Sequence, residues 1–298
     1  PPIALLNYCT TELPGYSTSL AVALLHWYYR RTMTIQRPLI LITNDDGITS
    51  KGLRIAAEVL EPLGEVLITA PHQQQSGAGR SMPPTSEGRI YRHELAINGH
   101  ALFGYGIEGT PAQVVQHGLF EIAERQVDLV VSGINYGENL GEGVTVSGTV
   151  GATLESASFK IPSIAISLET GPEHYLSLSD EIDFSGAAYF LWLFAKRTLL
   201  HGLPPKTDLL KVDVPAHATR ETPWRWTRLS QVRYFLPVKP QRRALTDPAP
   251  MGYETLSNFE HVERDSDVYA VRIDRVVSVT PLNLDMTAPL DLTSITPA

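Results

Sequence analysis

Two adjacent carboxylates in this chain could do chemistry: Asp45 and Asp46 belong to the segment Asn44-Asp45-Asp46-Gly47, which follows the apolar run 39–43 directly. Neighbouring carboxylates repel each other unless a cation relieves the repulsion, and a hard divalent cation takes oxygen ligands. Asn, Asp and Gly also form ordinary turns, so the motif by itself favours a turn. Its place after an apolar strand makes a metal site an equal alternative, because ligands bind at the carboxyl ends of strands in open α/β sheets.

A second polar segment, residues 72–80, follows the predicted strand 65–70. The hydroxyl of Ser76 is an oxygen ligand for a metal, and the glycines after it allow the backbone to approach a ligand closely. A flexible polar loop is the alternative interpretation of these residues.

A third segment, residues 132–149, offers polar side chains and then opens a helix. Asn135 carries a carbonyl oxygen suited to a metal, whereas Asn139 and Ser147 carry uncharged donors suited to phosphate. A glycine-rich turn before a helix also presents backbone N–H groups to an anion. Two ordinary loops with Thr149 as a helix cap are the alternative. Because all three segments follow strands, we predict that they share one site at one edge of a sheet.

The sequence between these segments alternates between strands and helices. Continuous apolar runs predict buried strands, and caps such as Ser50 and Thr110, followed by apolar residues at helical spacing, predict helices. Strands separated by helices imply βαβ units, and therefore an α/β fold around a mostly parallel sheet. Strands are predicted at residues 39–43, 65–70, 127–132, 163–168, 209–214, 225–236 (half-exposed and antiparallel) and 276–280, and helices at 50–64, 110–123, 149–159 and 183–200.

Residues 104–109 match the dinucleotide-binding pattern G-x-G-x-x-G and precede a predicted helix. A dinucleotide site also needs an acidic residue about 20 positions later, at the end of the next strand. Asp128 has that spacing but stands at the start of its strand, so we predict no NAD site and expect the glycines to shape a turn. The nine histidines form no H-x-x-x-H pattern, which argues against a zinc hydrolase.

Length and composition exclude several classes of protein. The chain has 298 residues, of which 43% are apolar and 19% charged, so it can bury a sizeable core. Its net charge of −8 is unfavourable for DNA binding. Its single cysteine, Cys9, excludes an intrachain disulfide and suits a reducing compartment, so we expect a cytoplasmic protein.

Residues 1–36 differ from the rest of the chain. Their apolar run 20–25 is far shorter than the roughly 20 residues that span a membrane. Arg30, the first basic residue, follows that run, whereas a secretory signal carries its positive charge before it. We expect a mis-called start or a disordered tail without a catalytic role, and a short docking helix from Ser19 to Arg31 is the alternative.

Six motifs occur in order along the chain: LILITNDDGI, APHQQQSGAG, GTPAQVV, DLVVSGINYGENLG, VSGTVGATLE and SVTPL. Together they resemble the SurE (survival protein E) family of metal-dependent 5′-nucleotidases, from about residue 37 to the C-terminus. The resemblance implies a Rossmann-like three-layer α/β core that carries a C-terminal antiparallel hairpin. It also implies a single domain at 37–298, whose segment 225–298 holds the subunits of a homodimer or homotetramer together. It implies hydrolysis of nucleoside 5′-monophosphates, with 3′-monophosphates as further candidate substrates.

The chain departs from the family's pattern at Gln113, Val146 and residues 247–254, which bears on nucleotide preference and on the oligomer. Two other classes of function stay open: an inactive nucleotide-binding oligomer, and a phospho-receiver, which would need an aspartate where Ser132 and Gly133 stand.

The resemblance also assigns roles to residues. It implies one Mg²⁺ or Mn²⁺ per subunit, held by Asp45, Asp46, Ser76 and Asn135. It further implies phosphate binding by Asn139, Ser147, Gly148 and Thr149, and catalysis by Asp45, Asn139 and Ser147.

Overall fold

The structure of the protein, a computed structural model, describes residues 36–175, 179 and 181–288. The chain divides into two compact units, residues 1–37 and 38–298, and everything below concerns the second unit. The docking helix predicted from Ser19 to Arg31 lies outside the described residues.

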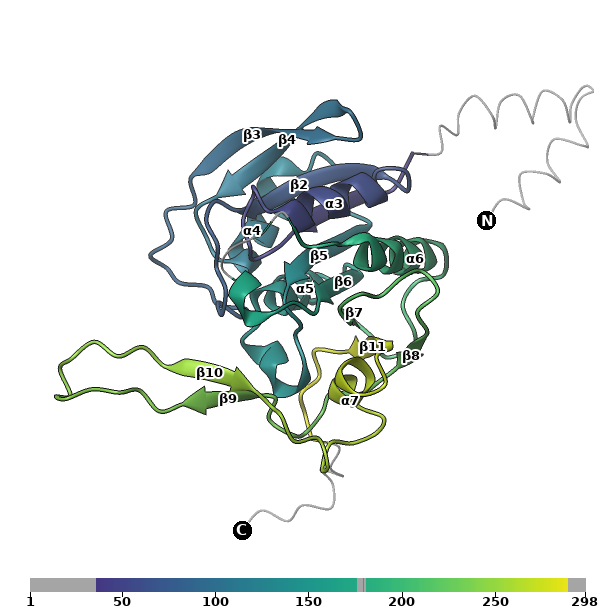
Figure 1. Ribbon diagram of the computed structural model, residues 1–298. Helices are drawn as coiled ribbons and strands as arrows, with labels where there is room; N and C mark the ends of the chain where they lie inside the picture. Colours follow the sequence, from purple (N-terminus) through teal and green to yellow (C-terminus); the bar gives the residue numbers. More distant parts are fainter. Residues whose placement is uncertain (1–35, 176–178, 180, 289–298) are drawn as a thin grey trace, which may run out of the picture. The chain divides into compact units, whose positions relative to one another are not determined.

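Nine strands form one sheet in the order β3-β4-β2-β1-β5-β6-β7-β11-β8 (Figure 1). The central neighbours from β4 to β7 all run parallel, whereas β3 is antiparallel to β4 and β11 is antiparallel to β7. The predicted mostly parallel sheet is therefore confirmed. The strands are β1 (Leu39–Thr43), β2 (Glu65–Pro71), β3 (Ile90–Ile97), β4 (His100–Ile107), β5 (Leu129–Tyr136), β6 (Ser163–Leu168), β7 (Leu209–Val214), β8 (Trp224–Trp226) and β11 (Val277–Leu282).

Helices cover both faces of this sheet and give the predicted three layers. Ile40 and Ile42 of β1 pack in a cluster with side chains of α3 and α6, whereas Leu39 and Leu41 pack in another cluster with Leu119 of η1. Alternate residues of a strand point to opposite faces, so α3 and α6 lie on one face and η1 on the other. The helices are α3 (Lys51–Leu60), α4 (Pro111–His117), α5 (Gly148–Ser158), α6 (Ser185–His201) and α7 (Asp267–Arg272), with short turns η1 (Gly118–Ile122), η2 (Gly141–Thr145) and η3 (Pro172–His174).

The predicted elements around the site are confirmed with two shifts. Ser50 caps α3, because its hydroxyl accepts a hydrogen bond from the amide of Leu53 at 3.4 Å. The third strand, β5, extends to Tyr136 instead of ending at residue 132, so Asn135 lies within a strand. Helix α5 begins at Gly148 with Ser147 as its N-cap, so it starts one residue earlier than predicted, and the alternative that Thr149 is the cap is wrong.

The sequence interpretation missed the β3–β4 hairpin. Its turn is Asn98-Gly99, both residues with positive φ (48° and 82°), which is a strong hairpin signal in a sequence. The expectation that the glycines of 104–109 shape a turn is wrong for Gly104 and Gly106, which lie within β4, whereas Gly109 lies in the bend that follows this strand. There a Cβ on Gly104 would come within 2.8 Å of Cδ1 of Leu95, and a Cβ on Gly106 within 2.8 Å of Nε2 of His93, so a larger residue at either position would force these side chains to move.

The predicted long antiparallel strand over 225–236 is also wrong. Residues 225–236 instead contain most of a short strand, β8 (Trp224–Trp226), which runs parallel to β11, and the first two residues of a separate strand, β9 (Phe235–Val238). Strands β9 and β10 (Gly252–Thr255) pair antiparallel in a separate two-stranded sheet, which is the expected C-terminal hairpin (Figure 1). Among the helices that the structure describes, none combines the length and the apolar character of a membrane span.

Candidate functional site

Asp45 and Asp46 stand in the turn after β1, separated from its last residue by Asn44, and both are buried although they carry carboxylates. The side chain of Asn44 fixes the turn around them: its Oδ1 accepts from the amide of Gly47, and its Nδ2 donates to the carbonyl of the same residue, both at 3.1 Å. Gly47 has a φ of +100°, which favours glycine at this position. The motif therefore forms the turn that its residue types predict and also buries two adjacent carboxylates, so the turn and a metal site are compatible.

Asp45 is held by the first turn of α5. The hydroxyl of Thr149 donates to Oδ1 of Asp45 at 2.6 Å, and a Cβ on Gly148 would come within 2.7 Å of Oδ2. Burial raises the pKa of Asp45, while the hydrogen bonds from Thr149 and from the backbone of Gly148 and Thr149 act in the opposite direction. The helix therefore supplies the donors that a buried carboxylate at this position needs.

Asp46 lies against two other segments. Its Oδ1 accepts from the side-chain amide of Gln74 at 3.2 Å, and its Oδ2 accepts from the backbone amide of Tyr136 at 3.3 Å. Burial and the neighbouring Asp45 raise the pKa of Asp46 well above its ordinary range. Two adjacent carboxyl groups that resist ionisation together are what a divalent cation would stabilise.

Asn135 and Ser76 lie on the elements that flank this pair. The Nδ2 of Asn135 donates to the carbonyl of Gly137 at 2.7 Å and to that of Tyr136 at 3.2 Å, which leaves its Oδ1 to coordinate or accept. Ser76 lies in an exposed turn, and its hydroxyl makes no hydrogen bond to any part of the chain that the structure describes. The loop of Ser76 is nevertheless fixed, since the amide of Gln75 donates to the carbonyl of Asp45 at 2.7 Å.

Asn139 and Ser147 both keep a hydrogen to donate. Asn139 uses its Nδ2 to donate to Ser167 Oγ at 2.7 Å, but a carboxamide nitrogen carries two hydrogens. Ser147 caps α5 by accepting from the amide of Val150 at 3.1 Å, which engages the oxygen and leaves the hydroxyl hydrogen available. The loop between them leads directly into the N-terminus of α5.

A buried ion cluster, formed by Lys211, Asp213 and Asp267, holds the start of this loop. The ammonium of Lys211 donates hydrogen bonds to the carboxylates of Asp213 and Asp267, and its nitrogen lies 2.9 Å from Oδ2 of Asp267. All three side chains are fully buried. Asp213 Oδ1 accepts from the amide of Asn139 at 2.7 Å, and Asp267 Oδ2 accepts from that of Gly141 at 2.9 Å. Burial alone would lower the pKa of Lys211, but the two carboxylates raise it above its ordinary value, which favours the charged ammonium. Burial also raises the pKa of Asp213, and Lys211 acts against that shift.

Sequence reasoning did not identify Gln74, the contact of Thr149 with Asp45, or this ion cluster. The cluster had one local signal: Lys211 and Asp213 stand two residues apart on one face of an otherwise apolar strand. Buried charges of this kind require partners, so a paired role was predictable, although the partner Asp267 was not. Gln74 and Thr149 stand among other polar residues and carry no such signal.

The side chains near Asp45 fit a hard divalent ion better than zinc. Within residues 36–175, 179 and 181–288, no group of three or more His, Cys, Asp or Glu side chains could hold a metal. The candidate donors are two buried carboxylates and the free Oδ1 of Asn135, all of them oxygen atoms. Oxygen donors suit Mg²⁺ and Mn²⁺, whose remaining positions water fills.

Comparisons with known proteins agree with this geometry. Residues 40–235 match the family model described as Survival protein SurE. The chain is 43% identical over 258 residues to the 5′-nucleotidase SurE of Thermococcus kodakarensis, covering 86% of this chain and 96% of that protein. It is 40% identical over 255 residues to the 5′-nucleotidase SurE of Archaeoglobus fulgidus, covering 85% and 94%. The crystal structure of the SurE protein from Aquifex aeolicus superposes with a TM-score of 0.68 at 32% identity, covering 84% of this chain and 95% of that one. The chain belongs to the SurE family.

Proposed function

We propose that this protein is a 5′-nucleotidase, which hydrolyses nucleoside 5′-monophosphates to nucleoside and phosphate. The observation that carries the proposal is the buried pair Asp45 and Asp46 beside the N-terminus of α5, in a chain similar to proteins named 5′-nucleotidase SurE. A buried acidic pair next to a helix N-terminus can serve a cation and a phosphate at the same time.

We assign one Mg²⁺ or Mn²⁺ per subunit to Asp45, Asp46, Ser76 and Asn135. The free Oδ1 of Asn135 and the raised pKa values of the two aspartates support this set. Bound there, a divalent ion would polarise the phosphoryl oxygens and lower the pKa of a water molecule.

The chain's own residues would position the attacking water and the phosphoryl group. Asp45, whose orientation Thr149 fixes, orients the attacking water and accepts its proton. Asn139 and Ser147 each donate their remaining hydrogen to the phosphoryl group, and Gly148 and Thr149 bring the N-terminus of α5 beside it. Donors that are already positioned contribute most as charge builds up in the transition state.

Two other classes of function make different predictions. A phospho-receiver would need an aspartate at the end of the third strand, but β5 carries Ser132, Gly133 and Asn135 there. An inactive nucleotide-binding oligomer would bind AMP without turning it over. The proposed nucleotidase requires turnover of its substrate, so an assay of phosphate release distinguishes it from both of the other functions.

The test is phosphate release from AMP and from p-nitrophenyl phosphate with Mg²⁺ or Mn²⁺, before and after EDTA. We expect activity that EDTA abolishes and either metal restores. Asp46→Asn should weaken Mn²⁺ binding in isothermal titration, whereas the matched variant Asp285→Asn, on an exposed residue, should bind Mn²⁺ like the unmodified protein. Full activity after exhaustive chelation would contradict the metal assignment, and binding of AMP without turnover would favour the inactive oligomer.

We also propose that residues 37–298 are the catalytic domain and that the segment 225–298 supports a homodimer or homotetramer. The hairpin of β9 and β10 lies outside the main sheet and exposes Val238 and Tyr253, which is the kind of surface that pairs with a partner. Light scattering of the intact protein and of a variant in which a short Gly-Ser linker replaces the whole hairpin, residues 235–255, tests this assignment. If both have the same number of subunits, the hairpin does not hold the oligomer together.

We further propose that residues 1–36 are dispensable for catalysis, since every candidate site residue follows Gln36. Deleting residues 1–33 should leave kcat/KM for AMP unchanged, and an insoluble or inactive product would contradict this.

We propose the cytoplasm as the location of the protein. Its single cysteine, Cys9, agrees with a reducing compartment.

A further inference from the structure

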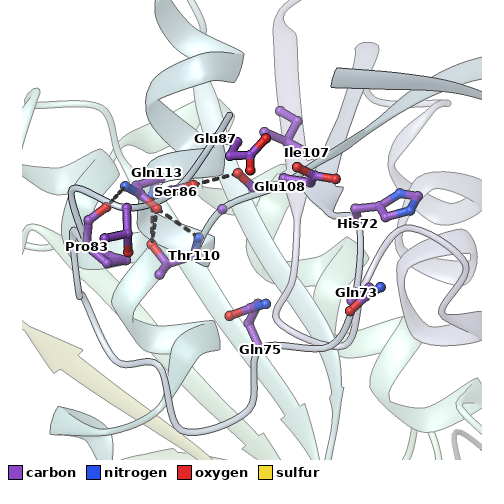
Figure 2. Close-up of a pocket in the computed structure, with 12 residues that line it drawn as sticks. His72, Gln73, Gln75, Pro83, Ser86, Glu87, Ile107, Glu108, Thr110 and Gln113 are labelled. Carbon is purple, nitrogen blue, oxygen red and sulfur yellow. Dashed lines mark hydrogen bonds between the residues drawn. The ribbon is translucent and has the colours of Figure 1, made fainter. Parts of the chain in front are cut away.

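The loop at residues 138–141, which carries the proposed phosphate donor Asn139, is contacted by the C-terminal part of the chain. The pocket of about 360 Å³ drawn in Figure 2 contains none of the proposed site residues, and its Gln113 bonds to Pro83 and Thr110. Residues 230–271 contribute instead a hydroxyl, a carboxylate and apolar side chains to the loop 138–141.

Tyr234 contacts the first residue of this loop. Its hydroxyl donates to Oε1 of Glu138 at 2.6 Å, and both side chains are buried. The guanidinium of Arg272 lies 3.6 Å from the same oxygen. The second oxygen of Glu138, Oε2, is buried and has no hydrogen-bond partner among the residues that the structure describes. Removing the Tyr234 hydroxyl therefore leaves a buried carboxyl poorly satisfied, which is costly.

Consecutive side chains of the loop have different partners. Leu140 packs in one buried apolar cluster with Tyr234. Glu138 and Leu140 thus both reach the C-terminal part of the chain, whereas Asn139, between them, donates to Oγ of Ser167 at 2.7 Å. The residues on either side of Asn139 are therefore anchored on Tyr234 or on the cluster around it.

Two restraints act on the peptide group that joins residues 138 and 139. Asp213 accepts a hydrogen bond from its N–H at 2.7 Å, and Tyr234 holds the side chain of the residue before it. A shift of this peptide group moves the side chain of Asn139, which keeps one hydrogen for a phosphoryl oxygen. A misplacement of about 1 Å at a reacting group can cost about a hundredfold in rate.

Resting on the proposed 5′-nucleotidase function, we propose that Tyr234 is a positioning residue: through its hydrogen bond to Glu138 it fixes Asn139 in the orientation that donates to the phosphoryl group. Tyr234 then acts through the loop and not on the metal or the nucleoside. Because the donor counts most when charge builds up in the transition state, loss of its position lowers kcat and leaves KM unchanged.

The experiment measures kcat and KM for AMP, and Mn²⁺ affinity by isothermal titration, in the unmodified protein, Tyr234→Phe, Asn139→Ala and the double variant. We expect Tyr234→Phe to lower kcat about tenfold, with KM and Mn²⁺ affinity unchanged. In the Asn139→Ala background the same substitution should have no further effect, because the side chain that Tyr234 positions is gone. The matched control is Tyr269→Phe, on a partly buried residue packed against the same cluster, which should keep full activity.

Two substitutions of Glu138 separate the hydrogen bond from the packing of the loop. Glutamine still offers an oxygen to the Tyr234 hydroxyl, so Glu138→Gln should retain kcat. Leucine cannot accept a hydrogen bond, so Glu138→Leu should lower kcat as Tyr234→Phe does. A loss in Glu138→Gln as large as that in Glu138→Leu would contradict the role of this hydrogen bond.

Two further results would overturn the positioning role. One is equal kcat in Tyr234→Phe and in the unmodified protein. The other is a loss on Tyr234→Phe that persists in full in the Asn139→Ala background, because a general structural defect does not depend on the side chain at position 139. If Tyr234→Phe is insoluble, Glu138→Leu takes its place in the same cycle, with the same two outcomes.

Failure of the nucleotidase function is recognised separately, as absence of AMP and p-nitrophenyl phosphate hydrolysis by the unmodified protein with Mn²⁺. In that case calorimetric binding of orthovanadate in the presence of Mg²⁺ tests the positioning role, since vanadate adopts the five-coordinate geometry of phosphoryl transfer and reports on donors placed for a transition state. Weaker binding in Tyr234→Phe and in Asn139→Ala, but not in Tyr269→Phe, supports the role. Equal binding in all three variants contradicts it.

Discussion

Thr149 donates its hydroxyl hydrogen to Oδ1 of Asp45 at 2.6 Å, joining residues 104 positions apart in the chain. Both side chains are buried, so no water competes for this hydrogen bond. One Asp45 oxygen is thereby fixed by the first turn of α5. The side chain of Thr149 consequently acts on the proposed catalytic carboxylate, while its place at the start of α5 also puts it beside the proposed phosphate position.

Replacing Thr149 by Val should weaken activity without unfolding the protein, because valine has nearly the shape of threonine but cannot donate. Loss of a hydrogen bond to a charged group costs about 1.5–3 kcal/mol, so kcat/KM for AMP should fall roughly tenfold to a hundredfold. The control is Thr153→Val in the same helix, whose hydroxyl donates only to the carbonyl of Val150. Equal losses in the two variants would mean that buried hydroxyls in α5 matter only for folding.

Asn139→Ala and Ser147→Ala should each lower kcat/KM steeply and leave Mn²⁺ affinity nearly unchanged. Each side chain keeps one hydrogen for a phosphoryl oxygen, and removing one preorganised donor typically costs about a hundredfold in rate or more. Steady-state kinetics beside calorimetric Mn²⁺ titration measures both quantities, with Asp46→Asn as the variant expected to lose metal. A loss of metal by Asn139→Ala as severe as that of Asp46→Asn would reassign Asn139 to the metal.

Lys211→Met should destabilise the protein by about 3–5 kcal/mol, since it leaves the buried carboxylates of Asp213 and Asp267 without their cation. Adding Asp213→Asn should restore part of that loss, because asparagine still accepts from the amide of Asn139 and removes one of the two charges. Urea unfolding of both single variants and of the double variant measures the coupling. Additive losses would show that charge repulsion is not the cause.

Glu138→Gln should flatten the dependence of stability on pH. Burial raises the pKa of Glu138, with the hydrogen bond from Tyr234 opposing it, so the folded protein binds a proton more tightly than the unfolded chain. Stability must therefore fall as pH rises from the unfolded value of 4.5 through the higher folded value. Urea midpoints between about pH 4 and pH 8 should decline less in the variant than in the unmodified protein. Parallel curves would contradict this assignment.

The sequence was most informative where strands are buried on both faces. The bounds of strands β1, β6 and β7 were predicted to the residue, because a short, mostly apolar run bounded by polar residues is typical of a strand that is buried on both faces. The β3–β4 hairpin was missed because exposed positions interrupt its apolar pattern, even though its Asn98-Gly99 turn was legible. The short strand β8 depends on pairing with the distant β11, which no local pattern encodes.

The location of the candidate site was also predictable from the sequence, whereas the hydrogen bonds within it were not. Its acidic pair and its polar loops stand at predicted strand ends, so their common location followed from the topology of a parallel sheet. The hydrogen bonds that orient them did not, because they join residues that are remote in the chain, such as Gln74 with Asp46 and Asn139 with Asp213. Distances of this kind are set by packing, and packing is decided by the whole chain.

The contact of Asp267 with Gly141 has a consequence for biosynthesis. The two residues are 126 positions apart, and Asp267 reaches the loop of Gly141 only from α7, near the C-terminal end of the domain. Because a chain emerges from the ribosome N-terminus first, β1 and β5 are available long before the residue that closes the loop beside them. The loop therefore acquires its final hydrogen bonds only after α7 has been synthesised, and a nascent chain that ends before α7 holds the acidic pair without the finished loop that we propose to bind phosphate.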